Sequence, residues 1–205
     1  MKTIVQIGVS DGNDHVFDLI NEIKENIFCI FIEPNPYCIP LIKKKYEFLP
    51  LKIISNIAIS NTNENKIMYF PPWFESGDAA VASLDKQHVI AHQILENTIK
   101  TLNVNCFTLN TFLNTILGLQ TPTDSIDYLF IDTEGHDCDI ILSIDFSKIS
   151  FDMICFEYIH SDGFSSGMHT NKMISTNKYL EYNGYYLEKM DTINHNIIYK
   201  KGNPL

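Results

Sequence analysis

The chain has 205 residues, a length sufficient for one domain (residues 1–205) with a substantial core. Its content of 45% hydrophobic and 20% charged residues is typical of globular proteins. Its formal net charge of −10 would repel nucleic acid and anionic membranes from most of its surface, so neither is an expected partner. No apolar run reaches the ~18 residues of a membrane span. The five cysteines are scattered, which predicts neither a disulfide framework nor a cysteine zinc site. Together with the lack of a recognisable signal peptide, they predict a location in the reducing cytoplasm.

The N-terminal stretch predicts a strand, a glycine turn and a helix. Residues 3–7 are apolar and β-branched, which favours a buried strand. Two glycines and short polar residues follow at 8–12, and apolar residues then recur at helical spacing over 16–23. Such a turn lets backbone N–H groups approach a ligand, and the helix N-terminus favours negative charge. The alternative is a turn that only joins the strand to the helix.

A second apolar strand, residues 28–32, ends in Glu33. An acidic residue at the tip of the second parallel strand is placed to accept hydrogen bonds from ribose hydroxyls. The glycine turn and this acid together fit either a nicotinamide cofactor or S-adenosylmethionine. Asn35 is predicted to cap a helix over residues 36–46.

The middle of the chain predicts strands, a long loop and a helix. Residues 57–70 resemble a hairpin-like excursion. Residues 71–85 include the only tryptophan and follow neither helical nor strand periodicity, so we predict a lid over the ligand. A helix is predicted over 86–102, with His88 and His92 one turn apart. Because no acidic third ligand is near in the sequence, we interpret them as surface histidines and assign no metal-ligating histidines.

A second group of functional residue types follows the strand predicted at 128–131. Asp132, Glu134 and His136 stand at its carboxyl end, where α/β folds bind their ligands, and a helix is predicted to begin near His136. Capping of that helix is the alternative role for the carboxylates. With Asp137, this stretch holds three acids and a histidine within six residues. That exceeds what capping requires, so the sequence favours a site here.

The last part of the chain predicts a strand, a loop, a helix and an antiparallel edge. The strand at 151–156 is followed by Glu157, and His160 comes three residues later. Residues 177–183 are predicted to form the last part of a helix, with Gly184 as its C-cap. The predicted antiparallel edge strands are residues 185–190 and 196–200.

Seven blocks, spread over nearly the whole chain, carry a family resemblance. The most specific is residues 126–137, which contains Asp-x-Glu-Gly. The others are residues 5–12, 33–36, 56–59, 108–113, 154–160 and 183–185. In these blocks the chain resembles the FkbM family of S-adenosylmethionine-dependent methyltransferases.

The resemblance implies a class I methyltransferase fold. We expect a Rossmann-like α/β protein with a mostly parallel seven-stranded sheet, an antiparallel C-terminal edge and helices on both faces. It also implies S-adenosylmethionine as the cofactor. The residues implied to bind it are Gly8, Ser10, Asp11, Gly12, Glu33, Pro34, Asn56, Ile57 and Asp132.

The implied reaction transfers a methyl group to a hydroxyl, on a sugar or another small molecule. Such a step needs alignment of the reactants and benefits from a general base. His136 and His160 are the candidate bases because the ordinary pKa of histidine suits that role. Asp132 and Glu134 are expected to orient the histidine, bind the acceptor or hold a divalent cation through oxygen ligands. The lid at 71–85, or a partner subunit in a homo-oligomer, would complete the pocket.

Two other functions remain open. Phe130 stands where many family members carry lysine, which favours a catalytically silent S-adenosylmethionine-binding or scaffold protein of the same fold. A nicotinamide-dependent oxidoreductase would also use a glycine turn and an acidic strand tip. The absence of G-x-G-x-x-G argues against it.

Overall fold

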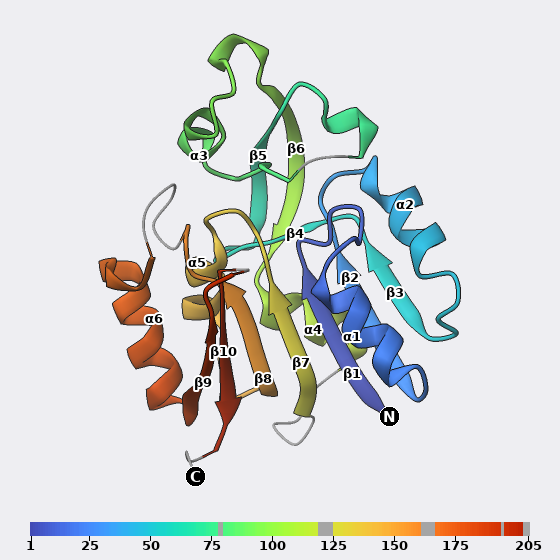
Figure 1. Cartoon of the computed structure of the whole chain (residues 1–205), viewed down its shortest axis with the longest axis vertical. Helices are drawn as coiled ribbons and strands as arrows, with labels where there is room; N and C mark the ends of the chain where they lie inside the picture. The colour runs from blue at the N-terminus through green and yellow to red at the C-terminus, as the bar shows by residue number, and fades with distance from the viewer. Residues whose placement is uncertain (78–79, 119–124, 161–166, 194, 203–205) are drawn as a thin grey trace.

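A computed structural model describes residues 1–77, 80–118, 125–160, 167–193 and 195–202 (Figure 1). Its strands form two sheets, one with seven strands in the order β3-β2-β1-β7-β8-β10-β9 and one with three in the order β4-β6-β5. The elements are β1 (Lys2–Ile7), α1 (His15–Ile23), β2 (Ile27–Ile32), α2 (Cys38–Lys45), β3 (Lys52–Ser55), β4 (Ala58–Ile59), β5 (Glu64–Phe70), η1 (Phe74–Ser76), α3 (Lys86–Ala91), η2 (Glu96–Thr98), β6 (Lys100–Phe107), α4 (Leu109–Leu117), β7 (Ser125–Ile131), α5 (Asp137–Ser143), β8 (Ser150–Glu157), η3 (Gly167–His169), α6 (Asn171–Tyr182), β9 (Tyr185–Asp191) and β10 (Asn196–Lys201).

The larger sheet is parallel except at its C-terminal edge. Val5 of β1 lies between Ile30 of β2 and Leu129 of β7, and these three strands run in the same direction. The antiparallel strand β10 pairs with both β8 and β9. The order of the strands along the sheet reverses at β1, and ligands of α/β folds bind in the crevice at such a point. The predicted α/β class, with its antiparallel edge, is confirmed.

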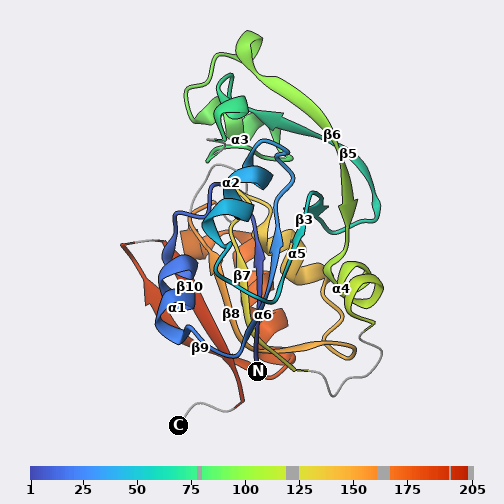
Figure 2. The same cartoon turned by 90° about the vertical axis from the view of Figure 1, so that its right-hand side faces the viewer.

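Both faces of this sheet are covered by helices, because its central strands are apolar on both sides. Neighbouring residues of a strand point to opposite faces. Ile4 packs in the core beneath α1 and α2, whereas Val5 packs in the core with α4, α5 and α6. Figure 2 shows the two layers of helices with the sheet between them.

The three-stranded sheet corrects two sequence predictions. The predicted helix over 86–102 is wrong, because α3 ends at Ala91 and β6 begins at Lys100. Val104 and Cys106 are buried while the neighbouring asparagines are exposed, which is the alternation of a strand. The hairpin over 57–70 is also wrong: β4 and β5 each pair with β6, not with each other. Figures 1 and 2 place this sheet above the carboxyl ends of β1 and β7.

The start of α2 is a further difference from the sequence prediction. The helix begins at Cys38, and Asn35 does not cap it. The side-chain oxygen of Asn35 instead accepts a hydrogen bond from Tyr37 N (3.1 Å), and its Nδ2 donates to the carbonyl of Phe74 (3.1 Å). Asn35 therefore joins the end of β2 to the segment after β5.

Among the described residues there is no helix with both the length and the apolar character that crossing a bilayer would require.

Candidate functional site

A cavity of about 410 Å³ lies between the carboxyl ends of β1, β2 and β7 and the three-stranded sheet. This volume is in the usual range for small-molecule sites. The loops after the three parallel strands form one wall. The smaller sheet and the segment that follows β5 form the other. The polar and glycine residues of the first wall are Gly8, Ser10, Asp11, Asn13, Asp14, Glu33, Asp132, Thr133, Glu134 and His136. The second wall includes Ile57, Ala58, Ile59, Met68, Ser76, Gly77, Ala80, Ala82 and Leu84.

The glycine turn after β1 packs directly against the loop after β7. Gly8 has φ +77°, and a Cβ added there would lie 1.7 Å from the carbonyl oxygen of Asp132. Only glycine fits such a close approach. Ser10, at φ +50°, is also in the left-handed region, so its backbone is strained. Gly8 and Ser10 both line the cavity.

Glu33 fastens this turn to the tip of β2. One carboxylate oxygen accepts hydrogen bonds from the backbone N–H groups of Val9 (3.1 Å) and Ser10 (2.8 Å), and the other accepts from Asn35 N (2.7 Å). The side chain is only 5% exposed. Burial raises the pKa of Glu33 to about 7, and these three hydrogen bonds oppose that rise. Because a carboxylate has about four lone-pair sites, Glu33 can still accept hydrogen bonds from a ligand.

Two residues expected to bind the cofactor support the cavity without lining it. Asn56 donates through Nδ2 to the backbone carbonyls of Glu33 (2.9 Å) and Pro34 (2.8 Å), so it holds the strand tip in place. Gly12, at φ +79°, packs against the ring of Tyr46. The other expected cofactor residues, Gly8, Ser10, Asp11, Glu33, Pro34, Ile57 and Asp132, line the cavity.

Asp132 and Glu134 bring two carboxyl groups to the end of β7. Asp132 is exposed to the cavity, while protein surrounds it on its other sides. Burial, and then the charges of Asp137 and Glu134, raise the pKa of Asp132 well above its ordinary value. Burial and Asp137 likewise raise the pKa of Glu134 to about 8. Glu134 adopts a left-handed backbone (φ +54°), and its carbonyl accepts a hydrogen bond from Ser83 Oγ (2.8 Å).

His136 lines the same cavity and is held from two sides. Its Nδ1 lies 3.3 Å from Asp139 Oδ2, and its Nε2 lies 3.1 Å from Ser60 Oγ. Asp139 also pairs with Lys172 at 2.9 Å. Burial opposes ionisation of Asp139, but hydrogen bonds from His136 and Lys172 outweigh it and lower its pKa to about 2. A carboxylate in this position fixes the orientation of the imidazole ring.

His160 lies outside the residues that line the cavity and belongs to a separate group of histidines. Its ring centroid is 4.8 Å from that of His88 and 5.4 Å from that of His92. His88 is fully buried, with Nε2 2.9 Å from Glu134 Oε2. The interpretation of His88 as a surface histidine is therefore wrong. The helical spacing of His88 and His92 is visible in the sequence, but their neighbours come from other parts of the chain.

Glu157, at the end of β8, is a fifth member of this neighbourhood. One ligand atom from each of Glu134, Glu157 and His160 lies within 4.8 Å of the other two. Burial and the charges of Asp132, Asp137 and Glu134 raise the pKa of Glu157 to about 9. Its position at a strand tip is the signal from which the sequence could identify it.

The predicted lid, residues 71–85, contributes directly to the cavity. Five of its residues line it: Ser76, Gly77, Ala80, Ala82 and Leu84. Its residues 78–79 lie outside the described residues. The segment is tied to β5 by reciprocal backbone hydrogen bonds between Tyr69 and Ser83 (2.9 and 3.0 Å). Whether it opens stays a prediction.

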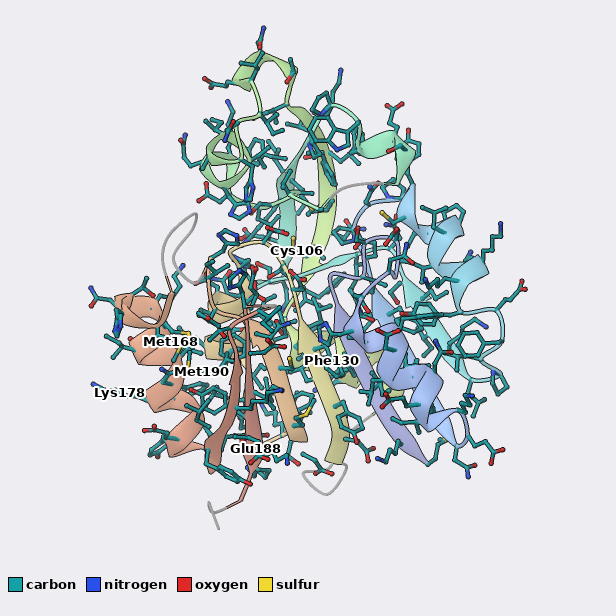
Figure 3. All side chains as sticks on the ribbon, viewed as in Figure 1. Cys106, Phe130, Met168, Lys178, Glu188 and Met190 are labelled. Atoms are coloured by element: carbon teal, nitrogen blue, oxygen red, sulfur yellow. The ribbon has the colours of Figure 1, made fainter. Side chains whose placement is uncertain are left out.

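Phe130, labelled in Figure 3 on β7, packs away from the cavity. It is 5% exposed, and its ring meets that of His15 edge to face at 5.6 Å in the core beneath α1. The lysine-to-phenylalanine departure at this position therefore does not change the described lining of the cavity.

Comparison with known proteins places a family model over most of the chain. The model described as "Methyltransferase FkbM domain" matches residues 6–187. No curated protein matches the sequence.

Solved structures of several methyltransferases and related proteins are similar at low identity. A fibrillarin pre-rRNA processing protein of Methanococcus jannaschii is 10% identical, with a TM-score of 0.49 over 98% of this chain and 67% of that chain. A ribosomal protein L11 methylase of Lactobacillus delbrueckii subsp. bulgaricus is 7% identical, with a TM-score of 0.46 over 98% and 70%. The CMeT domain of the citrinin polyketide synthase is 10% identical, with a TM-score of 0.48 over 99% and 47%.

Proposed function

Because the chain belongs to the FkbM methyltransferase family, we propose that it transfers a methyl group from S-adenosylmethionine to a hydroxyl of a sugar or another small molecule. The observation that carries this proposal is the cavity in which the glycine turn, Glu33 and Asp132 meet at the reversal of strand order. When bound, S-adenosylmethionine supplies the methyl group and its own leaving group. The protein supplies alignment and excludes water.

The cavity fits an adenosine with a charged methionine tail. Glu33 would accept hydrogen bonds from the ribose hydroxyls, and Ile57 with Ala58 offers an apolar surface to adenine. Gly8 lets the turn pack against the Asp132 carbonyl, where a side chain would collide, so the turn and Asp132 lie on the same wall of the cavity. Ser10 and Asp11 would hold the methionine portion. Those carboxyl groups of the cavity that are ionised would favour the positive charge of the sulfonium.

The acceptor hydroxyl would lie near the loop after β7. His136 is the general base in this proposal, since it lines the cavity and Asp139 holds its ring. Asp132 and Glu134, which also line the cavity, would hold the methyl-bearing end of the cofactor and the acceptor. His160, the other candidate base, has no described atom in the cavity lining and is not proposed for this role. A cytoplasmic location and a homo-oligomer remain predictions.

Calorimetric titration tests the cofactor first. We expect S-adenosylhomocysteine to bind and NAD not to bind. Binding of NAD with no binding of S-adenosylhomocysteine would overturn the proposal in favour of an oxidoreductase.

Transfer of a radiolabelled methyl group to a panel of hydroxylated small molecules then separates an enzyme from a silent binder. His136→Ala should bind S-adenosylhomocysteine within about twofold of wild type and lose about 10²–10⁴-fold in transfer rate. A protein that binds the cofactor but methylates no member of a broad panel supports the silent-binder alternative.

A further inference from the structure

Three imidazole rings meet beside the cavity. His88 lies in α3, His92 directly follows α3, and His160 follows β8. The ring centroids of His88 and His92 are 4.7 Å apart, and both rings lie within 5.4 Å of His160. Residues four apart on a helix project from one face, so the helical spacing brings two rings together and the fold adds the third. One nitrogen from each ring lies within 4.8 Å of the other two.

Two carboxylates complete this group, which we call the histidine–carboxylate cluster: His88, His92, His160, Glu134 and Glu157. His160 is shared between the three-histidine group and the group formed with the two glutamates. A zinc-type ion binds imidazole nitrogen and carboxylate oxygen at about 2.0–2.2 Å in a tetrahedral arrangement, so two of its ligand atoms are about 3.4 Å apart. The ligand atoms of each group lie within 4.8 Å of one another, so modest side-chain movement would bring them to that distance.

The chemistry of the cluster also suits such an ion. Neutral imidazoles and carboxylates are ligands for zinc and its neighbours in the first transition row. Two ionised glutamates and three neutral histidines would balance a charge of +2.

The backbone of Glu134 has an energetically unfavourable conformation. Its φ of +54° lies in the left-handed region, which is unusual for glutamate. Strained backbone of this kind persists where the surrounding structure enforces it, and it is frequent at functional sites. The Ser83 hydroxyl enforces it here by donating to the Glu134 carbonyl. Glu134 Oε2 also lies 2.9 Å from His88 Nε2, so this contact joins a carboxyl group and an imidazole of the cluster directly.

We propose that the histidine–carboxylate cluster binds one divalent transition-metal ion of the zinc type, which holds the acceptor hydroxyl at the edge of the cavity. The acceptor role rests on the proposed methyltransferase function, because Glu134 is the residue that belongs to both the cluster and the cavity. A metal lowers the pKa of a bound hydroxyl. The hydroxyl proton would pass to His136, the oxygen would form a bond to the methyl carbon, and the carbon–sulfur bond would break to release S-adenosylhomocysteine.

Metal binding to the purified protein tests the site. Protein stripped with a chelator is titrated with Zn²⁺ against a chromophoric chelator, and Co²⁺ absorption reports nitrogen and oxygen ligation. We expect one ion per chain and at least about tenfold weaker binding in His92→Ala and in His160→Ala. These two sites are less buried than His88, and thermal melting verifies that the variants fold. Wild-type binding no tighter than that of either variant would overturn the proposal.

Two histidines outside the cluster provide matched controls. His169→Ala changes an exposed residue of η3, and His136→Ala changes a residue of the cavity. Both should keep the wild-type Zn²⁺ affinity, although His136→Ala loses methyl transfer. Equal weakening by the controls and the cluster variants would contradict the assignment of ligands.

Titration with S-adenosylhomocysteine separates this inference from the proposed function. Binding of S-adenosylhomocysteine without Zn²⁺ binding overturns the metal site and leaves the methyltransferase proposal standing. Binding of Zn²⁺ without S-adenosylhomocysteine binding supports the metal site and overturns its acceptor role. We expect both to bind, and the affinity for S-adenosylhomocysteine to change by less than about threefold in His92→Ala, because His92 does not line the cavity.

Discussion

Gly8, directly after β1, packs against the backbone of the loop after β7. A methyl group there would overlap the Asp132 carbonyl, at 1.7 Å, and φ is +77°. The same contact positions Asp132 beside the glycine turn. The absence of a side chain at Gly8 therefore allows the turn to pack against the loop after β7, and both line the cavity.

Gly8→Ala should lower the free energy of unfolding by about 3 kcal/mol, since left-handed strain of about 1–2 kcal/mol adds to overpacking of about 1–3 kcal/mol. Denaturant unfolding measures the change. Gly118→Ala is the matched control: its φ is +61°, but no described atom would lie within 4 Å of the new Cβ. We expect the control to lose only about 1 kcal/mol. Equal losses would show that the contact with Asp132 is unimportant.

Glu33 should make cofactor binding depend on pH. Its pKa of about 7 in the free protein lies above the ordinary 4.5. Its contribution to stability is therefore complete below pH 4.5 and is lost as the pH rises through about 7. Ribose hydroxyls donate to the ionised form, so binding should release a proton, and affinity for S-adenosylhomocysteine should rise from pH 6 to pH 8.

Calorimetry in two buffers of different ionisation enthalpy measures the proton released on binding. Asp11 also lines the cavity but does not carry the hydrogen bonds of Glu33 to the turn. The pH dependence should persist in Asp11→Asn and disappear in Glu33→Gln. Proton release that is unchanged in Glu33→Gln would assign it to another group.

At the scale of elements, β6 is central to the smaller sheet. It pairs with β4 on one side and β5 on the other. Met68 of β5 and Ile59 of β4 line the cavity, so β6 sets the position of the wall that faces the glycine turn.

Val104→Ser should therefore lower both stability and cofactor affinity. Val104 is 6% exposed and packs in the core of the smaller sheet, so we expect a loss of about 1–3 kcal/mol in the free energy of unfolding. Asn103→Ser, at the exposed neighbouring position, should change it by less than about 0.5 kcal/mol. Denaturant unfolding and calorimetry check both variants. If Asn103→Ser is the more damaging, the register of β6 is wrong.

For the whole molecule, the cavity lies between two sheets, and Ile59 of the smaller sheet also packs in the core of the larger sheet. The core of the smaller sheet contains Met68, Phe70, Phe74 and Val104, and the core beneath α1 and α2 contains Ile4 and Phe31. A ligand between them would contact both sheets and stabilise their arrangement.

S-adenosylhomocysteine should therefore raise the unfolding temperature and protect both walls. At a concentration 100 times its Kd, binding adds about 2.7 kcal/mol to the free energy of unfolding. Hydrogen exchange should slow at residues 8–11 and also at 80–84. NAD at the same concentration is the control and should leave both unchanged. Protection confined to residues 8–11 would show that the segment after β5 does not contact the ligand.

Much of the larger sheet could be predicted from the sequence. Its buried strands are short apolar runs that end in glycine or acidic residues, and α1 and α4 begin at the capping residues Asp14 and Thr108. The smaller sheet could not be predicted as well. Its strands are only partly apolar, and the pairing of Val104 with Lys66 joins segments between which α3 intervenes.

The sequence by itself determined the strand, glycine turn and helix at the start of the chain, and the acids Glu33 and Asp132 at the strand tips. These depend on neighbouring residues and their periodicity, which local sterics and hydrophobic burial translate directly into structure. Only the tertiary structure decided that His88 is buried against Glu134 and joined by His160, while His136 alone among the histidines lines the cavity. Such contacts join residues far apart in the chain, and they form only when the smaller sheet packs over the ends of β7 and β8.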